Sequence, residues 1–184
     1  MSSADIMKRV CVVGAESTGT TTLTRELAEH YQTVWVPEYG REYSEKLAAA
    51  GIDYSHYAWR SEEFAHIARV QHEMEDAMAQ QANRVLFCDT DALATALWHE
   101  RYMGTRSPEV EAIAGQSHYD LYILTGCEIP FVADEVRDGE SFRQWMTRRF
   151  EEELSRRTVP WLKVSGGPEE RMLAAISAVD RLLS

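Results

Sequence analysis

The sequence lacks the long apolar runs and the paired cysteines that mark membrane-spanning and disulfide-rich proteins. No apolar run approaches the roughly 18 residues that a membrane-spanning helix needs, and the opening residues MSSADIMKRV contain no signal-peptide core. Only three cysteines occur in 184 residues, and none forms a C-x-x-C pair. Neither disulfides nor a zinc site are therefore indicated. We expect a single soluble domain over residues 1–184, located in the cytoplasm.

Basic residues are also scarce. The chain has 19 Lys and Arg against 30 Asp and Glu, which gives a net charge of −11. Such an acidic chain does not attract DNA, RNA or an anionic membrane through its overall charge, so we expect a small-molecule partner. Any phosphate group that it binds must be held by backbone N–H groups and by a few well-placed cations.

Short apolar runs alternate with longer segments of helical periodicity. The runs occupy residues 9–13, 33–36, 85–88, 121–124 and 161–164, and runs this short and continuous are typical of strands buried on both faces. Apolar residues at helical spacing line the segments from Leu23, from residue 60 to 81, from Ser141 and from Pro168. The alternation predicts an α/β protein with a five-stranded parallel sheet and helices on both faces. Ligands of such sheets bind beyond the carboxyl ends of the strands.

The first run leads into a glycine- and hydroxyl-rich loop of the pattern G-x-x-x-x-G. Glycines allow successive N–H groups to converge on an anion at the start of a helix, so this loop is a candidate phosphate-binding loop. An ordinary strand-to-helix turn with a hydroxyl-rich cap remains the alternative. The candidate nucleotide-binding residues are Gly14, Ala15, Glu16, Ser17, Thr18, Gly19, Thr20, Thr21 and Thr22.

Thr20 occupies the position where such loops carry a lysine. That lysine reaches the β- and γ-phosphates and supplies a positive charge that a hydroxyl cannot replace. Either another cation enters the site, or the loop binds a nucleotide without efficient transfer.

The third run ends in the acidic segment Asp89-Thr90-Asp91. An acid after four apolar residues matches the Walker B pattern, in which a carboxylate at the end of a strand holds Mg²⁺. We expect Asp89 and the hydroxyl of Thr21 to be the metal ligands, and we assign Asp91 to substrate binding. A helix N-cap formed by Asp89 or Thr90 remains the alternative.

The second run is followed by Glu38, where a general base for an incoming hydroxyl would lie. Arg41 is positioned to pair with Glu38 or to contact a phosphate. Tyr39 and Tyr43 belong to a dense group of aromatic residues that also includes Tyr54, Tyr57 and Trp59. These rings either stack on a planar substrate ring or pack in the core.

The segment from about residue 130 to 150 is polar, charged and interrupted by a glycine, which is typical of a mobile lid. Residues 137–149 contain four arginines but only one Asp and one Glu, so the stretch carries a net charge of +2. We expect Arg137 and Arg143 to supply the charge of the missing lysine, and Arg148 and Arg149 to belong to a solvated helix face.

Four motifs, GAESTGTTTL, VPEYGREY, LFCDTDAL and ADEVRDGE, together resemble one family, the P-loop ribosylnicotinamide kinase domain of NadR-type proteins and related small AAA-labelled ATPases. The resemblance runs in order over nearly the whole chain. It implies a three-layer P-loop fold of the nucleoside-kinase type and transfer of the γ-phosphate of ATP to the 5′-hydroxyl of nicotinamide riboside. It also implies that the loop holds ATP, that Thr21 and Asp89 surround Mg²⁺, that Glu38 lies near the acceptor hydroxyl, and that lid arginines close over the phosphates.

The leading hypothesis is therefore an ATP- and Mg²⁺-dependent small-molecule kinase, with Glu38, Asp89, Arg137 and Arg143 as catalytic residues. A nucleotide-binding or regulatory module with little transfer activity is the main alternative, and a nucleotide hydrolase is the third. The sequence leaves open the acceptor, the choice between ATP and GTP, and whether the chain forms a homo-oligomer.

Overall fold

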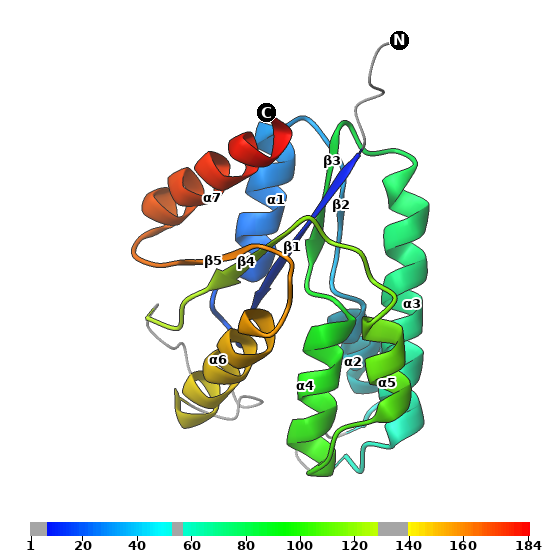
Figure 1. Ribbon diagram of the computed structural model, residues 1–184. Helices are drawn as coiled ribbons and strands as arrows, with labels where there is room; N and C mark the ends of the chain where they lie inside the picture. Colours follow the sequence, from blue (N-terminus) through cyan, green and yellow to red (C-terminus); the bar gives the residue numbers. More distant parts are fainter. Residues whose placement is uncertain (1–6, 53–56, 129–139) are drawn as a thin grey trace.

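Strands and helices alternate along the chain (Figure 1), and the computed structural model describes residues 7–52, 57–128 and 140–184. The strands are β1 (Lys8–Gly14), β2 (Trp35–Val36), β3 (Val85–Asp89), β4 (Leu121–Thr125) and β5 (Trp161–Val164). The helices are α1 (Thr20–His30), α2 (Tyr39–Ala49), α3 (Ser61–Ala79), α4 (Ala92–Met103), α5 (Pro108–Ala114), α6 (Glu140–Ser155) and α7 (Pro168–Leu183).

The five strands form one parallel sheet in the order β2-β3-β1-β4-β5. The central strand β1 pairs with β3 from Lys8 opposite Val85 and with β4 from Val10 opposite Leu121. The predicted five-stranded parallel sheet is confirmed, and its strands match the five apolar runs to within two residues.

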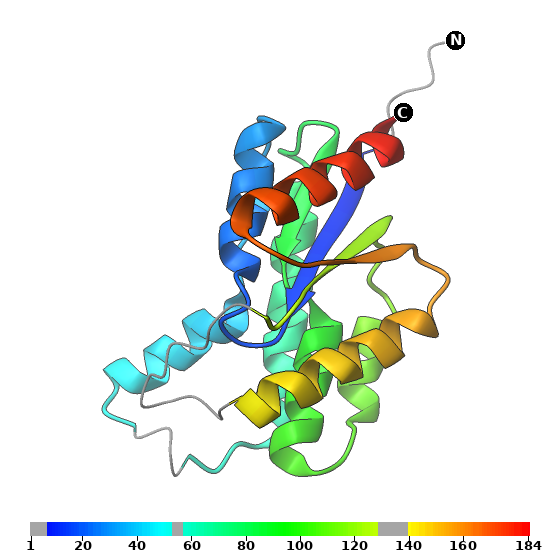
Figure 2. The ribbon, with the colours of Figure 1, turned by 90° about the vertical axis from the view of Figure 1, so that its left-hand side faces the viewer.

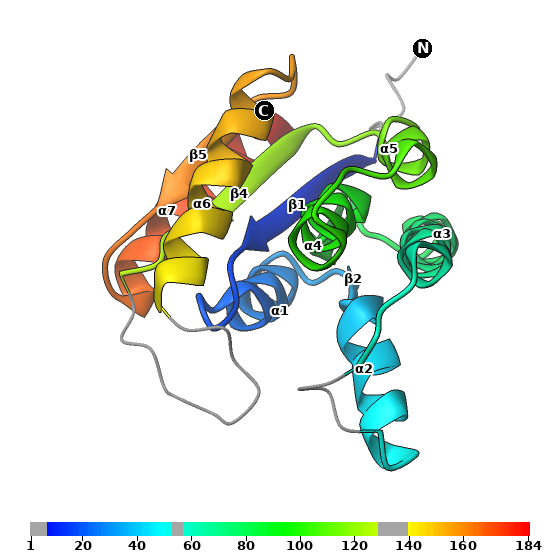
Figure 3. The same ribbon diagram turned by 90° about the horizontal axis from the view of Figure 1, so that it is seen from below.

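Alternate residues of β1 point to opposite faces of the sheet, and both faces are covered. Val10 and Val12 belong to a core shared with α1 and α7, whereas Cys11 and Val13 pack with α4 and α6. Figure 3 shows α1 and α7 on one side of the sheet and α3, α4 and α5 on the other. Burial on both faces explains why the strands are continuously apolar.

Helices α2, α4 and α5 add to the helical segments expected from periodicity. α2 contains no buried residue and extends away from the sheet (Figure 2), with α3 as its neighbour. α4 begins after Asp91, whose carboxylate accepts a hydrogen bond from the N–H of Ala94. Asp91 is therefore the N-cap, in place of Asp89 or Thr90, the two candidates considered from the sequence.

The carboxyl ends of three central strands meet at one edge of the sheet. Gly14 ends β1, Asp89 ends β3 and Thr125 ends β4. Within the described residues, no helix has the length and apolar character needed to cross a membrane.

Candidate functional site

The loop between β1 and α1 has the backbone of an anion-binding turn. Ser17 and Gly19 adopt positive φ values of 56° and 86°, and such left-handed residues turn neighbouring N–H groups toward a common point. Gly14 has no room for a side chain, because a Cβ atom there would lie 2.0 Å from Thr125 Oγ1 and 2.6 Å from Thr18 Oγ1. These features favour the phosphate-loop interpretation over an ordinary turn.

Two buried threonine hydroxyls attach this loop to the sheet. Thr18 Oγ1 donates to the carbonyl of Ala15 at 2.6 Å and lies 2.7 Å from Thr125 Oγ1. Thr125 Oγ1 in turn lies 3.3 Å from the carbonyl oxygen of Val13. Both side chains are at most 1% exposed, so the loop conformation is fixed by buried polar contacts.

Thr21 and Asp89, the expected metal ligands, are in direct contact. Thr21 Oγ1 donates a hydrogen bond to Asp89 Oδ2 at 2.5 Å. Asp89 is 1% exposed, and its other oxygen, Oδ1, is buried without a hydrogen-bond partner among the described residues. Burial raises the pKa of Asp89, whereas hydrogen bonds from Thr21 and Thr20 and the charge of Arg41 oppose the rise.

A buried carboxylate oxygen without a partner costs free energy that a cation would recover. Asp89 and Thr21 supply the hard oxygen ligands that Mg²⁺ prefers, so these residues fit the ion. In the described part of the chain, no three His, Cys, Asp or Glu side chains are grouped so that they could hold a metal ion. A magnesium ion here would depend on phosphate oxygens for further ligands, as is usual in nucleotide sites.

Glu38 lies at the carboxyl end of β2, beside the same edge. Burial raises the pKa of Glu38 to about 7, and the negative charges of Asp89 and Glu16 add to the rise. Arg41, whose Nε atom lies 3.8 Å from Glu38 Oε2, opposes it. A carboxylate with a pKa near neutrality suits a general base.

The arginines expected to replace the missing lysine have different surroundings. Arg143 is 1% exposed on α6, whereas Arg137 lies outside the described residues, as do residues 130–139 of the predicted lid. Arg41 is the cation whose charge acts on both Glu38 and Asp89.

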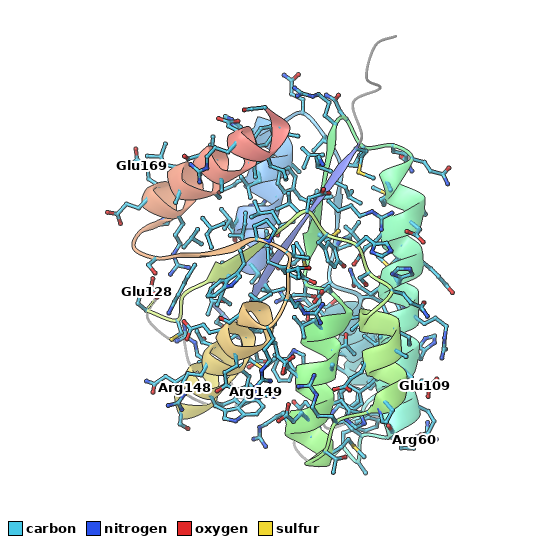
Figure 4. All side chains as sticks on the ribbon, in the orientation of Figure 1. Arg60, Glu109, Glu128, Arg148, Arg149 and Glu169 are labelled. Carbon is cyan, nitrogen blue, oxygen red and sulfur yellow. The ribbon has the colours of Figure 1, made fainter. Side chains whose placement is uncertain are left out.

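Arg148 and Arg149 are labelled on α6 in Figure 4. Arg148 is exposed, as expected, but Arg149 is half-buried and pairs with Glu100 at 2.9 Å and Glu153 at 3.4 Å. Arg149 therefore links α6 to α4 instead of lying on a solvated face.

The structure does not bring Asp91 to the surface of the site. The side chain is 1% exposed, one oxygen caps α4, and the other accepts a hydrogen bond from the hydroxyl of Tyr122 at 2.7 Å. Both oxygens are therefore used inside the protein.

The described members of the aromatic group lie close to one another. The ring centroids of Tyr39 and Tyr43 are 6.3 Å apart, and Tyr43 and Trp59 are also 6.3 Å apart. Trp59 lies 5.0 Å from Tyr57, whereas Tyr54 falls outside the described residues.

Glu63 organises this aromatic group and was not anticipated from the sequence. It is 4% exposed and accepts hydrogen bonds from the hydroxyls of Tyr43 at 2.9 Å and Tyr57 at 2.5 Å. Burial favours a higher pKa, but these bonds and the N–H of Arg60 outweigh it and hold the pKa of Glu63 below its usual range. In the sequence Glu63 is an ordinary acidic residue near the start of a helix, and nothing in its neighbourhood predicts this role.

A cavity of about 300 Å³ lies at the opposite edge of the sheet, between Arg9, His72, Asp76 and Asp120. Arg9 Nη2 pairs with Asp76 Oδ1 at 2.7 Å, and the backbone N–H of Arg9 donates to Asp120. Its charged groups bind one another, and we assign it no role.

The parallel sheet, the loop after β1 with its positive φ values and the acid at the end of β3 together define a P-loop fold of the nucleoside-kinase type. The family described as "AAA domain" matches residues 9–171, and the chain belongs to this family.

Two curated proteins are similar in sequence, and both are called "Trifunctional NAD biosynthesis/regulator protein NadR". The protein from Escherichia coli (strain K12) is 31% identical over 79% of this chain and 36% of its own length. The protein from Salmonella typhimurium is 33% identical over 71% of this chain and 31% of its own length. The chain thus spans about a third of the length of these relatives, and the predicted resemblance to NadR-type proteins is confirmed.

Solved structures agree with the fold. A NadR protein in complex with NR has a TM-score of 0.73 and 24% identity, and the match covers 95% of this chain and 51% of that one. A NadR protein in complex with NAD and AMP-PNP has a TM-score of 0.71 and 25% identity, over 95% of this chain and 49% of that one. A thymidylate kinase from Ehrlichia chaffeensis has a TM-score of 0.65 and 13% identity, over 94% and 98% of the two chains.

Proposed function

We propose that the protein is an ATP-dependent kinase that phosphorylates a nucleoside, with nicotinamide riboside as the acceptor. The observation that carries this proposal is the position of Glu38, a carboxylate with a pKa of about 7, beside the Thr21–Asp89 pair at the phosphate loop. The similarity to NadR proteins, one of them solved with NR and another with AMP-PNP, supports the choice of substrates.

The loop would hold the phosphates of ATP with the N–H groups of residues 15–21. Its positive φ values at Ser17 and Gly19 direct these groups inward. Thr21 and Asp89 would hold Mg²⁺. The ion would neutralise charge on the β- and γ-phosphates.

Glu38 would accept the proton of the acceptor hydroxyl. The acceptor oxygen then forms a bond to the γ-phosphorus, and the bond between that phosphorus and the oxygen bridging it to the β-phosphorus breaks. The products are ADP and the phosphorylated nucleoside, and the proton remains on Glu38 until solvent removes it. A pKa near 7 allows Glu38 both to take up and to release this proton at neutral pH.

The charge that a lysine would supply must come from arginine, since Thr20 is neutral. Arg41 is the best-supported candidate because its charge reaches Glu38 and Asp89. Arg143 and Arg137 would contribute from α6 and from the preceding segment.

The aromatic group around Tyr39, Tyr43 and Trp59 would bind the base of the acceptor. Flat rings favour a planar partner, and a cationic pyridinium ring is attracted both to their π faces and to the carboxylate of Glu63. The hydrogen bonds from Tyr43 and Tyr57 to Glu63 hold two of these rings in fixed orientations.

Thr20 supports a second candidate, a nucleotide-binding module with little transfer activity. Its side chain is only 9% exposed and supplies no charge to the γ-phosphate. Such a module would bind ATP through the same loop without producing ADP.

One assay separates the two candidates. The protein is incubated with ATP, Mg²⁺ and nicotinamide riboside, and ADP and nicotinamide mononucleotide are quantified. Equal amounts of both products are expected. Release of ADP without the mononucleotide would reject the acceptor, and tight ATP binding without turnover would favour the second candidate.

A further inference from the structure

One arginine outside the predicted site contacts three loops at the carboxyl edge of the sheet. Arg171, in the first turns of α7, is 3% exposed. It donates to the backbone carbonyls of Gly166 at 2.9 Å, Thr18 at 2.8 Å and Gly126 at 3.1 Å. Its Nη2 atom also lies 3.1 Å from Glu128 Oε1.

The acceptors belong to loops that follow three adjacent strands. Thr18 lies in the phosphate loop after β1, Gly126 follows β4, and Gly166 follows β5. Glu128, which lies three residues beyond β4 and is labelled in Figure 4, also accepts a hydrogen bond from the N–H of Gly166 at 3.0 Å. A single buried guanidinium therefore joins the phosphate loop to the turn before α7.

The bond to Thr18 fixes the direction of one phosphate-binding N–H group. The carbonyl of Thr18 and the N–H of Gly19 belong to the same planar peptide unit, and no cis peptide bond occurs among the described residues. In a trans unit these two groups point in opposite directions. Because Arg171 holds the carbonyl of Thr18, the N–H of Gly19 points away from Arg171.

The bonding pattern requires a guanidinium. Arginine presents five N–H donors in a rigid plane, and here they reach four acceptors in different directions. A lysine ammonium is a point donor on a flexible chain and cannot span the same set.

We propose that Arg171 is a positioning residue for the nucleotide, which sets the Thr18–Gly19 peptide for phosphate binding and couples it to the Gly166 turn. Arg171 acts through backbone groups and does not touch the acceptor. Its effect on turnover rests on the proposed kinase function, whereas its effect on nucleotide binding does not.

The test compares Arg171→Ala, Arg171→Lys and the unaltered protein. Removal of Arg171 is expected to raise the KM for ATP and the Kd for ADP by about tenfold to hundredfold, since small displacements of binding groups have effects of this size. The KM for the acceptor is expected to change by less than about twofold, because Arg171 has no contact with the acceptor side. For Arg171→Lys, the KM for ATP and the Kd for ADP are expected to lie between those of the other two proteins.

Arg181→Ala is the matched control. Arg181 lies on the same helix, and its Nη1 atom donates to Ser177 Oγ at 2.8 Å within that helix. We expect this variant to keep the ADP affinity of the unaltered protein. Melting temperatures are measured for all variants, and kinetics are recorded well below the lowest of them.

Chemical rescue distinguishes positioning from general stability. Millimolar guanidinium added to Arg171→Ala is expected to restore part of the ADP affinity, whereas urea at the same concentration is not. If Arg171→Ala fails to fold, Arg171→Lys carries the comparison of the two KM values.

The two proposals fail in different ways. An unaltered protein that binds ADP but never transfers phosphate would reject the kinase function, and the ADP affinities of the variants would still decide the role of Arg171. An ADP affinity unchanged in Arg171→Ala, or acceptor and ATP KM values raised equally, would overturn the positioning role. An unaltered protein that binds no nucleotide would overturn both.

Discussion

Individual side chains at the edge of the sheet divide into those that would meet the nucleotide and those that hold other groups in place. Thr21, Asp89 and Glu38 belong to the first kind. Thr18, Thr125 and Arg171 belong to the second, since their hydrogen bonds stay inside the protein.

The rate is expected to depend on pH through Glu38. Its pKa of about 7 means that the deprotonated, active form increases as the pH rises through 7, so kcat/KM should rise and then level off above this value. Glu38→Gln should lower kcat by about 10²–10⁴-fold and abolish the rise. Glu42→Gln is the control, because Glu42 lies one turn further along the chain and pairs with Lys46. This variant should keep both the normal kcat and the rise of kcat/KM with pH. A Glu38→Gln enzyme with a normal rate and the same pH profile would contradict the assignment.

Removal of the Thr21 hydroxyl should weaken the response to magnesium. Thr21→Ala removes the partner of Asp89 Oδ2 and one metal ligand, and we expect the Mg²⁺ concentration for half-maximal activity to rise by at least about tenfold. Thr21→Ser keeps the hydroxyl and should stay close to the unaltered protein. The Mg²⁺ dependence of the activity of each variant is measured at saturating ATP. Equal Mg²⁺ dependence of Thr21→Ala and Thr21→Ser would contradict the role of the Thr21 hydroxyl as a metal ligand.

At the scale of helices and loops, close packing between the phosphate loop and β4 leaves little room for substitutions in the loop. Gly14 is surrounded by the hydroxyls that attach the loop to β4. The loop and the end of β4 therefore behave as one unit, and a change in either should alter nucleotide binding.

Gly14→Ala is expected to abolish nucleotide binding. Its Cβ atom would lie 2.0 Å from Thr125 Oγ1, so the loop or β4 must move. Gly115→Ala is the matched control, because the nearest atoms to a Cβ there are at 3.4 and 3.5 Å and its φ is −71°. Calorimetry with ADP measures both variants, and normal binding by Gly14→Ala would show that the loop adapts.

Whether a helix or strand could be predicted from the sequence depended on how its residues are buried. The strands were predictable because both of their faces are covered, and α3, α6 and α7 were predictable because each buries one stripe. α4 buries every residue from Ala92 to Leu97 and so shows no stripe, whereas α2 buries no residue at all. Periodicity fails in both situations, because it depends on a contrast between two faces.

The placement of Asp89 and Glu38 at the carboxyl edge of the sheet could be predicted, because each follows an apolar run, and their chemical roles are proposals. Arg171 and Glu63 were not predictable, because their partners are backbone carbonyls and tyrosine hydroxyls that only the fold brings close. Asp91 has the residue type of a site acid, yet the geometry makes it a helix cap.

The whole molecule contains a buried acid outside the candidate site, Glu75, and it makes the stability depend on pH. Glu75 on α3 is 1% exposed and accepts a hydrogen bond from Tyr119 at 2.6 Å. Burial raises the pKa of Glu75 to about 8, despite that hydrogen bond. Between about 4.5 and 8, the folded protein holds a proton that the unfolded chain has released.

The free energy of unfolding is therefore expected to fall as the pH rises through this window, by up to about 1.4 kcal/mol per pH unit from this group. Denaturant unfolding from pH 5 to 8 measures the slope. Glu75→Gln should make the slope smaller, whereas Glu73→Gln, at an exposed position of the same helix, should not. Identical slopes for the two variants would contradict the burial of a protonated Glu75.

The strand order also has a kinetic consequence. β1 and β2 come first in the chain, but they do not pair with each other. In the sheet β3 lies between them and pairs with both, and β3 begins only at Val85. Within the described residues, no strand pair can form until that segment has been synthesised. A chain emerging from the ribosome must therefore keep the apolar strand β1 without a neighbouring strand until residues 85–89 have been synthesised, and such segments are prone to aggregate. Folding of the sheet, and with it of the nucleotide site, starts only when β3 is available.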